Sequence, residues 1–381
     1  MSAVRVEGEV AAGFEKVADV FRENFEDRGD TGAACAVYVE GSRVVDIWAG
    51  TTAGGPWHPY TRNCLFSVSK GITTICVLMA VERGAIDLDA PVTSYWPEFG
   101  AQGKEATTVR QLLAHQAGLT APAVDLTLDD LQAWDPAVRA LAEQAPAWKP
   151  GTSFAYHAVT FGWLAGEVLR RATGKRPRDW LAEHVAGPLG VAMSFGVDID
   201  DPSFAPMLDP LPITDPEAAA AEAAALQDPL VVRAMSLGGA LDPANLFASA
   251  QRREVMACEL PGVNLVSNAR SCAKVYAATV GEVDGVRLLG PDVVLDAREV
   301  RSEGPPYAGP NVGLRWGSGF MLSSVRRPML GEGSFGHDGA GGHLAFGHLE
   351  AQVGFGYQTV RPGGVPDDRA DELCRALQAC L

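Results

Sequence analysis

The chain has 381 residues, of which 47% are hydrophobic, and its 31 basic and 47 acidic side chains give a net charge of −16. Such a charge repels nucleic acid and anionic membrane surfaces, so we expect neither as a partner. No stretch approaches the roughly 18 apolar residues of a membrane-spanning helix. The N-terminus also lacks the long apolar centre of a signal peptide, because charged residues at positions 7, 9, 15 and 16 interrupt it.

The seven cysteines are an odd number and show neither Cys-x-x-Cys spacing nor clustering with histidine. Several stand in apolar contexts, and we interpret them as small core residues: Cys35, Cys64, Cys76 and Cys272. This usage predicts a reducing, cytoplasmic location. The histidines lack the spacing of metal ligands, and we expect neither a metal nor a cofactor.

Hydrophobic periodicity and turn residues predict the following elements in chain order. They are a helix over 10–27, a β-hairpin of 33–39 and 43–48, an apolar helix from 67 to near Gly84, a threonine-capped helix over 107–115, helices over 126–145 and 161–173, a proline-rich loop over 202–216, helices over 217–226 and 269–280, strands over 344–346 and 352–360, and a last helix over 369–380.

Strands are thus expected at both ends of the chain, with helices between them. This arrangement predicts an α+β fold in which both termini contribute to one antiparallel sheet flanked by helices. We expect a discontinuous sheet domain of residues 1–66 and 285–381, and a mainly helical domain of residues 67–284. A catalytic cleft would lie between the two domains.

Ser67 and Lys70 form a Ser-x-x-Lys pattern at the start of the apolar helix. Residues three apart on a helix share one face, so the amine can reach the hydroxyl. Burial at the edge of an apolar helix disfavours the charged lysine, and a neutral amine can take the serine proton. This pair is a known alternative to Ser-His-Asp. The alternative interpretation is a solvated serine and a surface lysine.

Two further segments fit the same chemistry. Tyr156 follows a turn just before the apolar helix over 161–173, where a neighbouring cation would favour its phenolate and allow proton transfer. The glycine-rich segment over 336–342 allows close approach to a ligand, and the Ala340 amide could pair with that of Ser67 as an oxyanion hole. A buried tyrosine and an ordinary glycine turn are the alternatives. His337 and Asp338 are adjacent on a strand and face opposite ways, which disfavours a Ser-His-Asp triad.

Four segments together resemble the serine β-lactamase and penicillin-recognising superfamily, and within it the class C β-lactamase-like family VIII carboxylesterases. They are LFSVSK at 65–70, LLAHQAGL at 112–119, PGTSFAYH at 150–157 and FGHDGAGG at 335–342. The resemblance spans roughly residues 15 to 365. It implies a helix-flanked antiparallel sheet plus an all-α lobe, with Ser67 as acylated nucleophile, Lys70 as general base and Tyr156 as second proton-transfer group.

The chain departs from the superfamily pattern at two of these segments. Tyr-x-Asn becomes Tyr156-His157-Ala158, and Lys-Thr-Gly becomes His337-Asp338-Gly339, which removes an amide and a permanent cation. Both changes disfavour efficient action on β-lactams, whose carboxylate that cation would hold. We take His337, Asp338, Gly339 and His157 as candidate substrate-binding residues. Trp316 and Phe320 are candidates for the cleft lining, with core packing as the alternative, and His115 is expected to be structural.

The resulting hypothesis is a serine carboxylesterase that cleaves small-molecule esters of small acyl groups through a Ser67 acyl-enzyme. An acyltransferase, amidase or peptidase of secondary metabolism could use the same acyl-enzyme and remains an alternative. A weak β-lactamase and a non-catalytic binding module on the same fold are lesser alternatives.

Overall fold

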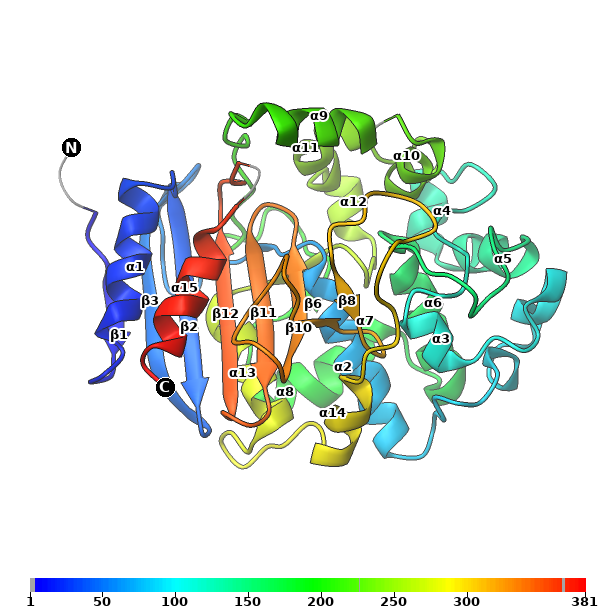
Figure 1. The fold of residues 1–381 in the computed structure, drawn as a ribbon, viewed down its shortest axis with the longest axis horizontal. Coiled ribbons are helices and arrows are strands. Elements are labelled where there is room, and N and C mark those ends of the chain that lie inside the picture. The colour runs from blue at the N-terminus through cyan, green and yellow to red at the C-terminus, as the bar shows by residue number, and fades with distance from the viewer. Residues whose placement is uncertain (1–3, 226, 365–366) are drawn as a thin grey trace.

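The computed structural model describes residues 4–225, 227–364 and 367–381. In this part of the chain, one antiparallel sheet has the strand order β1-β3-β2-β12-β11-β10-β9-β8, with β4 paired to β3 (Figure 1). Its strands are β1 Glu7–Val10, β2 Gly32–Val39, β3 Ser42–Thr52, β4 Gly55–Pro56, β8 Arg315–Trp316, β9 Met321–Leu322, β10 Ser334–Gly339, β11 His343–His348 and β12 Val353–Thr359.

The two ends of the chain meet where β12 pairs with β2, in a register that runs from Val353 opposite Val39 to Thr359 opposite Ala33. Alternate side chains of β2 enter different cores, because successive residues of a strand point to opposite faces. Cys35 and Val37 pack on one side of the sheet, and Ala36 and Tyr38 on the other. The predicted α+β fold, with a sheet assembled from both termini, is therefore confirmed.

Helices cover both faces of this sheet (Figure 1). On one face lie α1 (Glu15–Glu26) and α15 (Arg369–Gln378), which contact each other. On the other face α13 (Ala269–Val280) packs against β2, β11 and β12. A Cβ atom added at Gly354 of β12 would lie 2.2 Å from the Ala273 carbonyl oxygen of α13. The absence of a side chain at Gly354 therefore lets the backbones of β12 and α13 come into contact.

Most of the remaining helices lie to the right of the large sheet in the view of Figure 1, and others lie above and below it. A small second sheet has the strand order β5-β7-β6. Its strands are β5 Asn63–Cys64, β6 Ser194–Phe195 and β7 Leu265–Ser267. The α-helices are α2 Val68–Glu82, α3 Val109–Leu113, α4 Leu128–Ala133, α5 Asp135–Glu143, α6 Thr160–Thr173, α7 Pro177–Leu181, α8 Gly187–Leu189, α9 Pro216–Ala225, α10 Pro229–Ser236, α11 Leu246–Ala250, α12 Arg253–Ala257 and α14 Pro291–Ala297. Short 3-10 helices cover Val92–Ser94, Pro97–Gly103 and Pro243–Asn245, and a π-helical turn covers Ala182–Ala186.

Several predicted elements differ from the observed ones. The helix predicted over 126–145 is two helices, α4 and α5, because Trp134 between them has a φ of 69°. The helix predicted from residue 10 begins at Glu15, since residues 7–10 form β1 instead. The glycine-rich segment over 336–342 is half strand, β10, and half turn. Residue 226 of the predicted helix over 217–226 lies outside the described residues, as do residues 1–3, 365 and 366 of the predicted sheet domain.

Helix α2 lies at the centre of the molecule and contacts α6, β10 and β11. Every residue from Val68 to Ala80 is buried, which explains why its sequence is apolar on all sides. Because α13 lies within the predicted helical domain of 67–284 but packs on the sheet, the sheet and the helical part share an extensive core. The proposed division of the chain into 1–66 with 285–381, and 67–284, stays a prediction.

Candidate active site

Ser67 stands at the N-terminal end of α2 and is partly exposed, in contrast to the helix behind it. The residue before it, Phe66, has a φ of 46°, a left-handed conformation that costs free energy for a side chain other than glycine. Packing holds Phe66 in place, with its ring 5.4 Å from that of Phe247 and 6.3 Å from that of His343. This strained turn presents the Ser67 hydroxyl at the surface of the helix end.

The Ser67 Oγ atom has two functional neighbours. Lys70 Nζ lies 3.1 Å away and the Tyr156 hydroxyl donates to Oγ at 2.8 Å. Lys70 Nζ also donates to the carbonyl oxygens of Ala158 at 2.6 Å and Gly262 at 2.7 Å. A neutral amine has two N–H groups, and these two carbonyls accept both. Its lone pair is then left for the third neighbour, the Ser67 hydroxyl.

Lys70 is fully buried, and burial lowers its pKa to about 7, although the negative charge of Asp338 opposes the shift. A substantial neutral fraction therefore exists near pH 7, as a lysine base requires. The sequence indicates the Ser67–Lys70 pair but not the Ala158 and Gly262 carbonyls, since a backbone acceptor has no signature in the sequence.

Tyr156 is held by aromatic side chains on several elements. Its ring stacks on that of Trp316 of β8 at 5.3 Å and lies 5.2 Å from that of His115. Lys70 Nζ lies 4.8 Å from the ring centroid. Burial raises the pKa of Tyr156 above its ordinary value of 10.0, and the hydrogen bond with Ser67 offsets only part of that effect. Tyr156 is therefore a neutral phenol at rest, whereas the sequence argument expects the lysine to favour the phenolate.

The turn after β10 brings a second backbone segment to the nucleophile. A Cβ atom added at Gly339 would lie 2.2 Å from the Leu65 carbonyl oxygen, so only a glycine allows this approach. The Gly342 amide donates to the Gly339 carbonyl at 3.2 Å and closes a turn with Ala340 at its second position. Within the described residues, the amides of Ser67 and Ala340 donate to no other protein group. Such amides are suited to an oxyanion.

His337 and Asp338, predicted to contact substrate, have different surroundings. The His337 ring is buried, and its centroid lies 6.0 Å from that of the Tyr156 ring. The His337 Nδ1–H donates to the Asp338 carbonyl at 2.6 Å. The Asp338 side chain is 30% exposed and lies 3.3 Å from the buried guanidinium of Arg327, which also pairs with Asp371 at 2.8 Å. Burial would raise the pKa of Asp338, but His337 and Arg327 together lower it to about 2.

His157 and His115 are fully buried behind Tyr156. The His157 Nδ1–H donates to the Ala155 carbonyl at 2.7 Å and Nε2 accepts from the Leu119 amide at 3.1 Å. Both ring nitrogens of His157 are therefore occupied by backbone groups, and its role as a substrate-binding residue stays a prediction. His115 accepts from the His157 amide at 3.2 Å, in keeping with a structural role.

Trp316, taken from the sequence as a cleft residue, is 2% exposed and covers the inner face of Tyr156. Phe320 is fully buried against Phe335, with ring centroids 5.0 Å apart, so it belongs to the core. In the described part of the chain, no cluster of three or more His, Cys, Asp or Glu side chains is placed to hold a metal ion.

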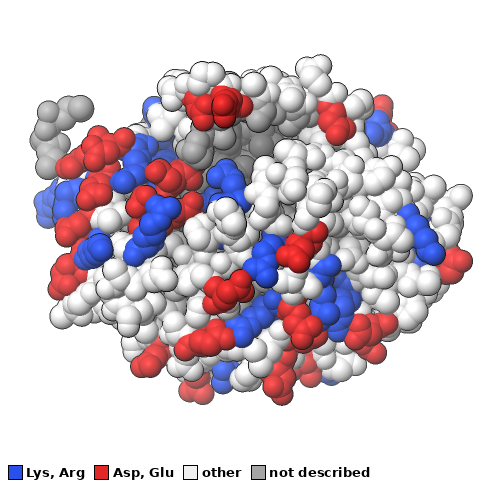
Figure 2. Space-filling view, in the orientation of Figure 1, with Lys and Arg blue, Asp and Glu red and all other residues white. Residues whose placement is uncertain are grey.

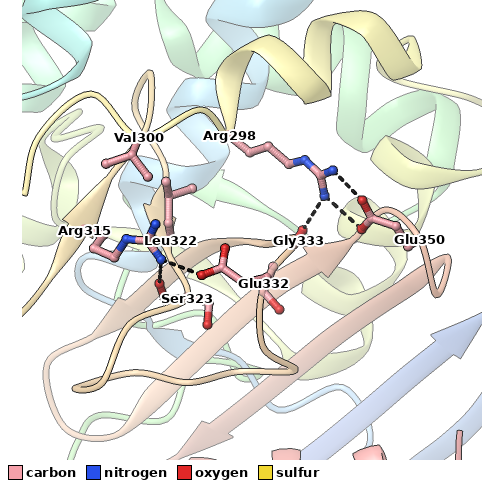
Figure 3. Close-up of a pocket in the computed structure, with 9 residues that line it drawn as sticks. Arg298, Val300, Arg315, Leu322, Ser323, Glu332, Gly333 and Glu350 are labelled. Carbon is pink, nitrogen blue, oxygen red and sulfur yellow. Dashed lines mark hydrogen bonds and ion pairs between the residues drawn. The ribbon is translucent and has the colours of Figure 1, made fainter.

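A separate cavity of about 260 Å³ lies at the edge of the sheet beside β9 and β10 (Figure 3). Its charged walls are paired with each other, because Arg315 contacts Glu332 at 2.7 Å and Arg298 contacts Glu350 at 2.8 Å. None of the residues around Ser67 lines it. This cavity is therefore distinct from the Ser67 site and offers no unpaired charge to a ligand.

Comparisons with known proteins show the family to which the chain belongs. The family model described as Beta-lactamase matches residues 17–379. The chain is 33% identical over 359 residues to the esterase/beta-lactamase LipL of Mycobacterium tuberculosis, which covers 92% of this chain and 82% of that protein.

Two solved structures are also similar. A crystal structure of a family VIII carboxylesterase has a TM-score of 0.85 and 34% identity, over 99% of this chain and 100% of that one. EstA of Arthrobacter nitroguajacolicus Rue61a has a TM-score of 0.82 and 31% identity, over 98% of this chain and 97% of that one. The resemblance predicted from the four segments is confirmed, and the chain belongs to the beta-lactamase family of serine hydrolases.

Proposed function

We propose that this protein hydrolyses carboxylic esters of small acyl groups through an acyl-enzyme on Ser67. The observation that carries the proposal is the position of Ser67 Oγ between a buried Lys70 amine at 3.1 Å and the Tyr156 hydroxyl at 2.8 Å. The esterase relatives at 33% and 34% identity support ester chemistry. A small ester is also consistent with the loss of the cation and the amide that would grip a β-lactam.

Acylation begins when neutral Lys70 accepts the Ser67 proton and Oγ attacks the ester carbonyl. The tetrahedral oxyanion lies between the amides of Ser67 and Ala340, where the start of α2 adds a partial positive charge. Tyr156, a neutral phenol, donates a proton to the leaving alkoxide and recovers one from protonated Lys70. The alcohol leaves, and Ser67 carries the acyl group.

Deacylation uses the same groups in reverse. Lys70 takes a proton from a water molecule that attacks the acyl carbonyl, and the oxyanion again lies between the two amides. Collapse of this intermediate releases the carboxylic acid and returns the proton to Ser67. Asp338, which is partly exposed, would face the substrate beside Ala340, while the buried rings of Trp316 and His337 would support Tyr156.

The first test compares the wild-type protein with Ser67→Ala on p-nitrophenyl acetate, butyrate and octanoate. We expect kcat/KM to fall by about 10⁴-fold or more in the variant, because the nucleophile is lost. We also expect a fluorophosphonate probe to add its mass to the wild-type protein only. Ser42→Ala is the matched control, since Ser42 is exposed at the start of β3 and contacts none of the site groups named here. Labelling of Ser67 should persist in that variant.

Ester hydrolysis that survives Ser67→Ala would contradict the proposal. A higher kcat/KM for the octanoate ester than for the acetate ester would contradict the preference for small acyl groups. If kcat/KM for a chromogenic cephalosporin equalled that for the esters, the preference for esters would be contradicted.

A further inference from the structure

A buried arginine lies behind the turn that carries Ala340. Arg369 is the first residue of α15 and is 1% exposed, and its guanidinium contacts two carboxylates. Its Nη1 donates to Asp30 at 2.7 Å, and the Nε and Nη2 edge donates to both oxygens of Asp367 at 2.9 and 2.6 Å. A buried charge is costly without such partners, so the surrounding backbone is built around this side chain.

The same guanidinium edge reaches the turn. Arg369 Nη2 donates to the Gly341 carbonyl at 3.3 Å, one residue after Ala340. The other end of the guanidinium, Nη1, donates to the Arg361 carbonyl at 3.1 Å and does not contact the turn. Asp30 and Asp367 therefore bind opposite ends of the Arg369 guanidinium. Asp367 binds the end that also donates to the Gly341 carbonyl.

The turn needs such a restraint because its backbone is permissive. Gly341 has a φ of 92° and Gly342 a φ of 102°, values that glycine adopts readily and leaves as readily. The turn also packs between Arg369 on one side and the Leu65 backbone on the other. A Cβ atom at Gly342 would lie 2.9 Å from Arg369 Nη2 on one side, and one at Gly339 would lie 2.2 Å from the Leu65 carbonyl oxygen on the other. Movement of Arg369 would therefore change the distance from Ala340 to Ser67.

We propose that Arg369 is a positioning residue for the oxyanion hole, which fixes the Ala340 amide relative to Ser67 by holding the Gly341 carbonyl. Arg369 touches no substrate and acts only through the turn. The inference rests on the proposed function, because it gives the Ala340 amide its role in acylation.

The test uses the two carboxylates as a matched pair. Asp367→Asn weakens the grip on the guanidinium edge that holds Gly341, whereas Asp30→Asn weakens the grip on the other end. We expect Asp367→Asn to lower kcat for p-nitrophenyl butyrate by about tenfold, with KM within twofold, because a misplaced oxyanion donor affects the transition state more than the bound ester. Affinity for a trifluoromethyl ketone that traps Ser67 should fall by the same factor.

Asp30→Asn should keep kcat within twofold at temperatures below its melting point, even though it removes a buried ion pair. Arg369→Lys should reproduce the loss in kcat, since a single ammonium cannot replace the guanidinium fork. Circular dichroism melts of all variants separate this effect from loss of the fold, and Asp367→Asn carries the test if Arg369→Lys does not fold.

The inference about Arg369 would be overturned if folded Asp367→Asn kept the wild-type kcat, or if Asp367→Asn and Asp30→Asn lost kcat equally. Neither result would affect the proposed function. Wild-type protein without Ser67-dependent hydrolysis would overturn the proposed function and, with it, this inference.

Discussion

At the scale of single residues, the chemistry depends on how one buried nitrogen is surrounded. Lys70 Nζ has two carbonyl acceptors and one hydroxyl neighbour. This set satisfies the three N–H groups of the ammonium as well as the two of the amine, so the lysine can gain a proton during acylation without rearrangement. The three histidines nearest the site, at 115, 157 and 337, all have pKa values lowered by burial, and they stay uncharged near neutral pH.

This arrangement predicts the pH dependence of kcat/KM. The active form needs neutral Lys70, whose pKa is about 7, so kcat/KM for a neutral ester should rise with pH through a midpoint near 7 and level off about 1.5 units higher. Replacement of Asp338 by Asn removes a negative charge that raises the pKa of Lys70. The midpoint should therefore move to lower pH in that variant.

Steady-state kinetics between pH 5.5 and 9 measure both midpoints. The control is Asp200→Asn, which changes an exposed carboxylate paired with Arg253 and should leave the midpoint where it is. An unchanged or higher midpoint in Asp338→Asn would argue against Lys70 as the titrating base.

At the scale of elements, glycines set the distances between packed backbones. Gly162 of α6 allows the Gly262 backbone to approach, because a Cβ atom there would lie 2.3 Å from the Gly262 nitrogen. That approach brings the Gly262 carbonyl to Lys70. Gly354 of β12 does the same for α13 and the sheet.

We expect Gly354→Ala to lower the free energy of unfolding by about 1–3 kcal/mol, because the new methyl group would meet backbone atoms of Ala273 and Ala277 within 2.3 Å. Gly281→Ala is the matched control. Gly281 follows the last residue of α13, and a Cβ atom there would lie 3.8 Å from its nearest neighbour, the Ala277 carbonyl oxygen. Urea unfolding followed by tryptophan fluorescence measures both variants. Equal midpoints for the two would show that the contact between β12 and α13 tolerates the added volume.

At the scale of the whole molecule, most charged side chains lie on the surface, whereas most cysteine thiols are buried. Acidic and basic side chains are interspersed on the face shown in Figure 2 rather than gathered by sign. None of the described helices combines the length and the hydrophobicity that a bilayer-spanning segment needs. All seven cysteines are free and six are buried, and burial raises their pKa values, to about 12 for Cys64 and Cys272.

Thiol reactivity therefore reports the intact fold. We expect Ellman's reagent to modify about one thiol per native chain, at Cys380, and seven after denaturation, because only Cys380 is partly exposed. Cys380→Ser should reduce the native value to near zero. Rapid modification of two or more thiols in the native protein would contradict the packing described here. The cytoplasmic location predicted from cysteine usage stays a prediction.

Features that depend on short spacings can be predicted from the amino-acid sequence. A serine and a lysine three apart on an apolar helix, Tyr156 before α6, and the alternating strands at both ends follow from local periodicity. The groups that surround these residues are known from the folded structure alone. The Lys70 acceptors are 88 and 192 residues away, and backbone carbonyls are the same at every position in a sequence. The break at Trp134, the bonds that occupy both nitrogens of His157, and the grip of Arg369 on the Ala340 turn arise likewise from long-range packing, which spacing along the chain does not record.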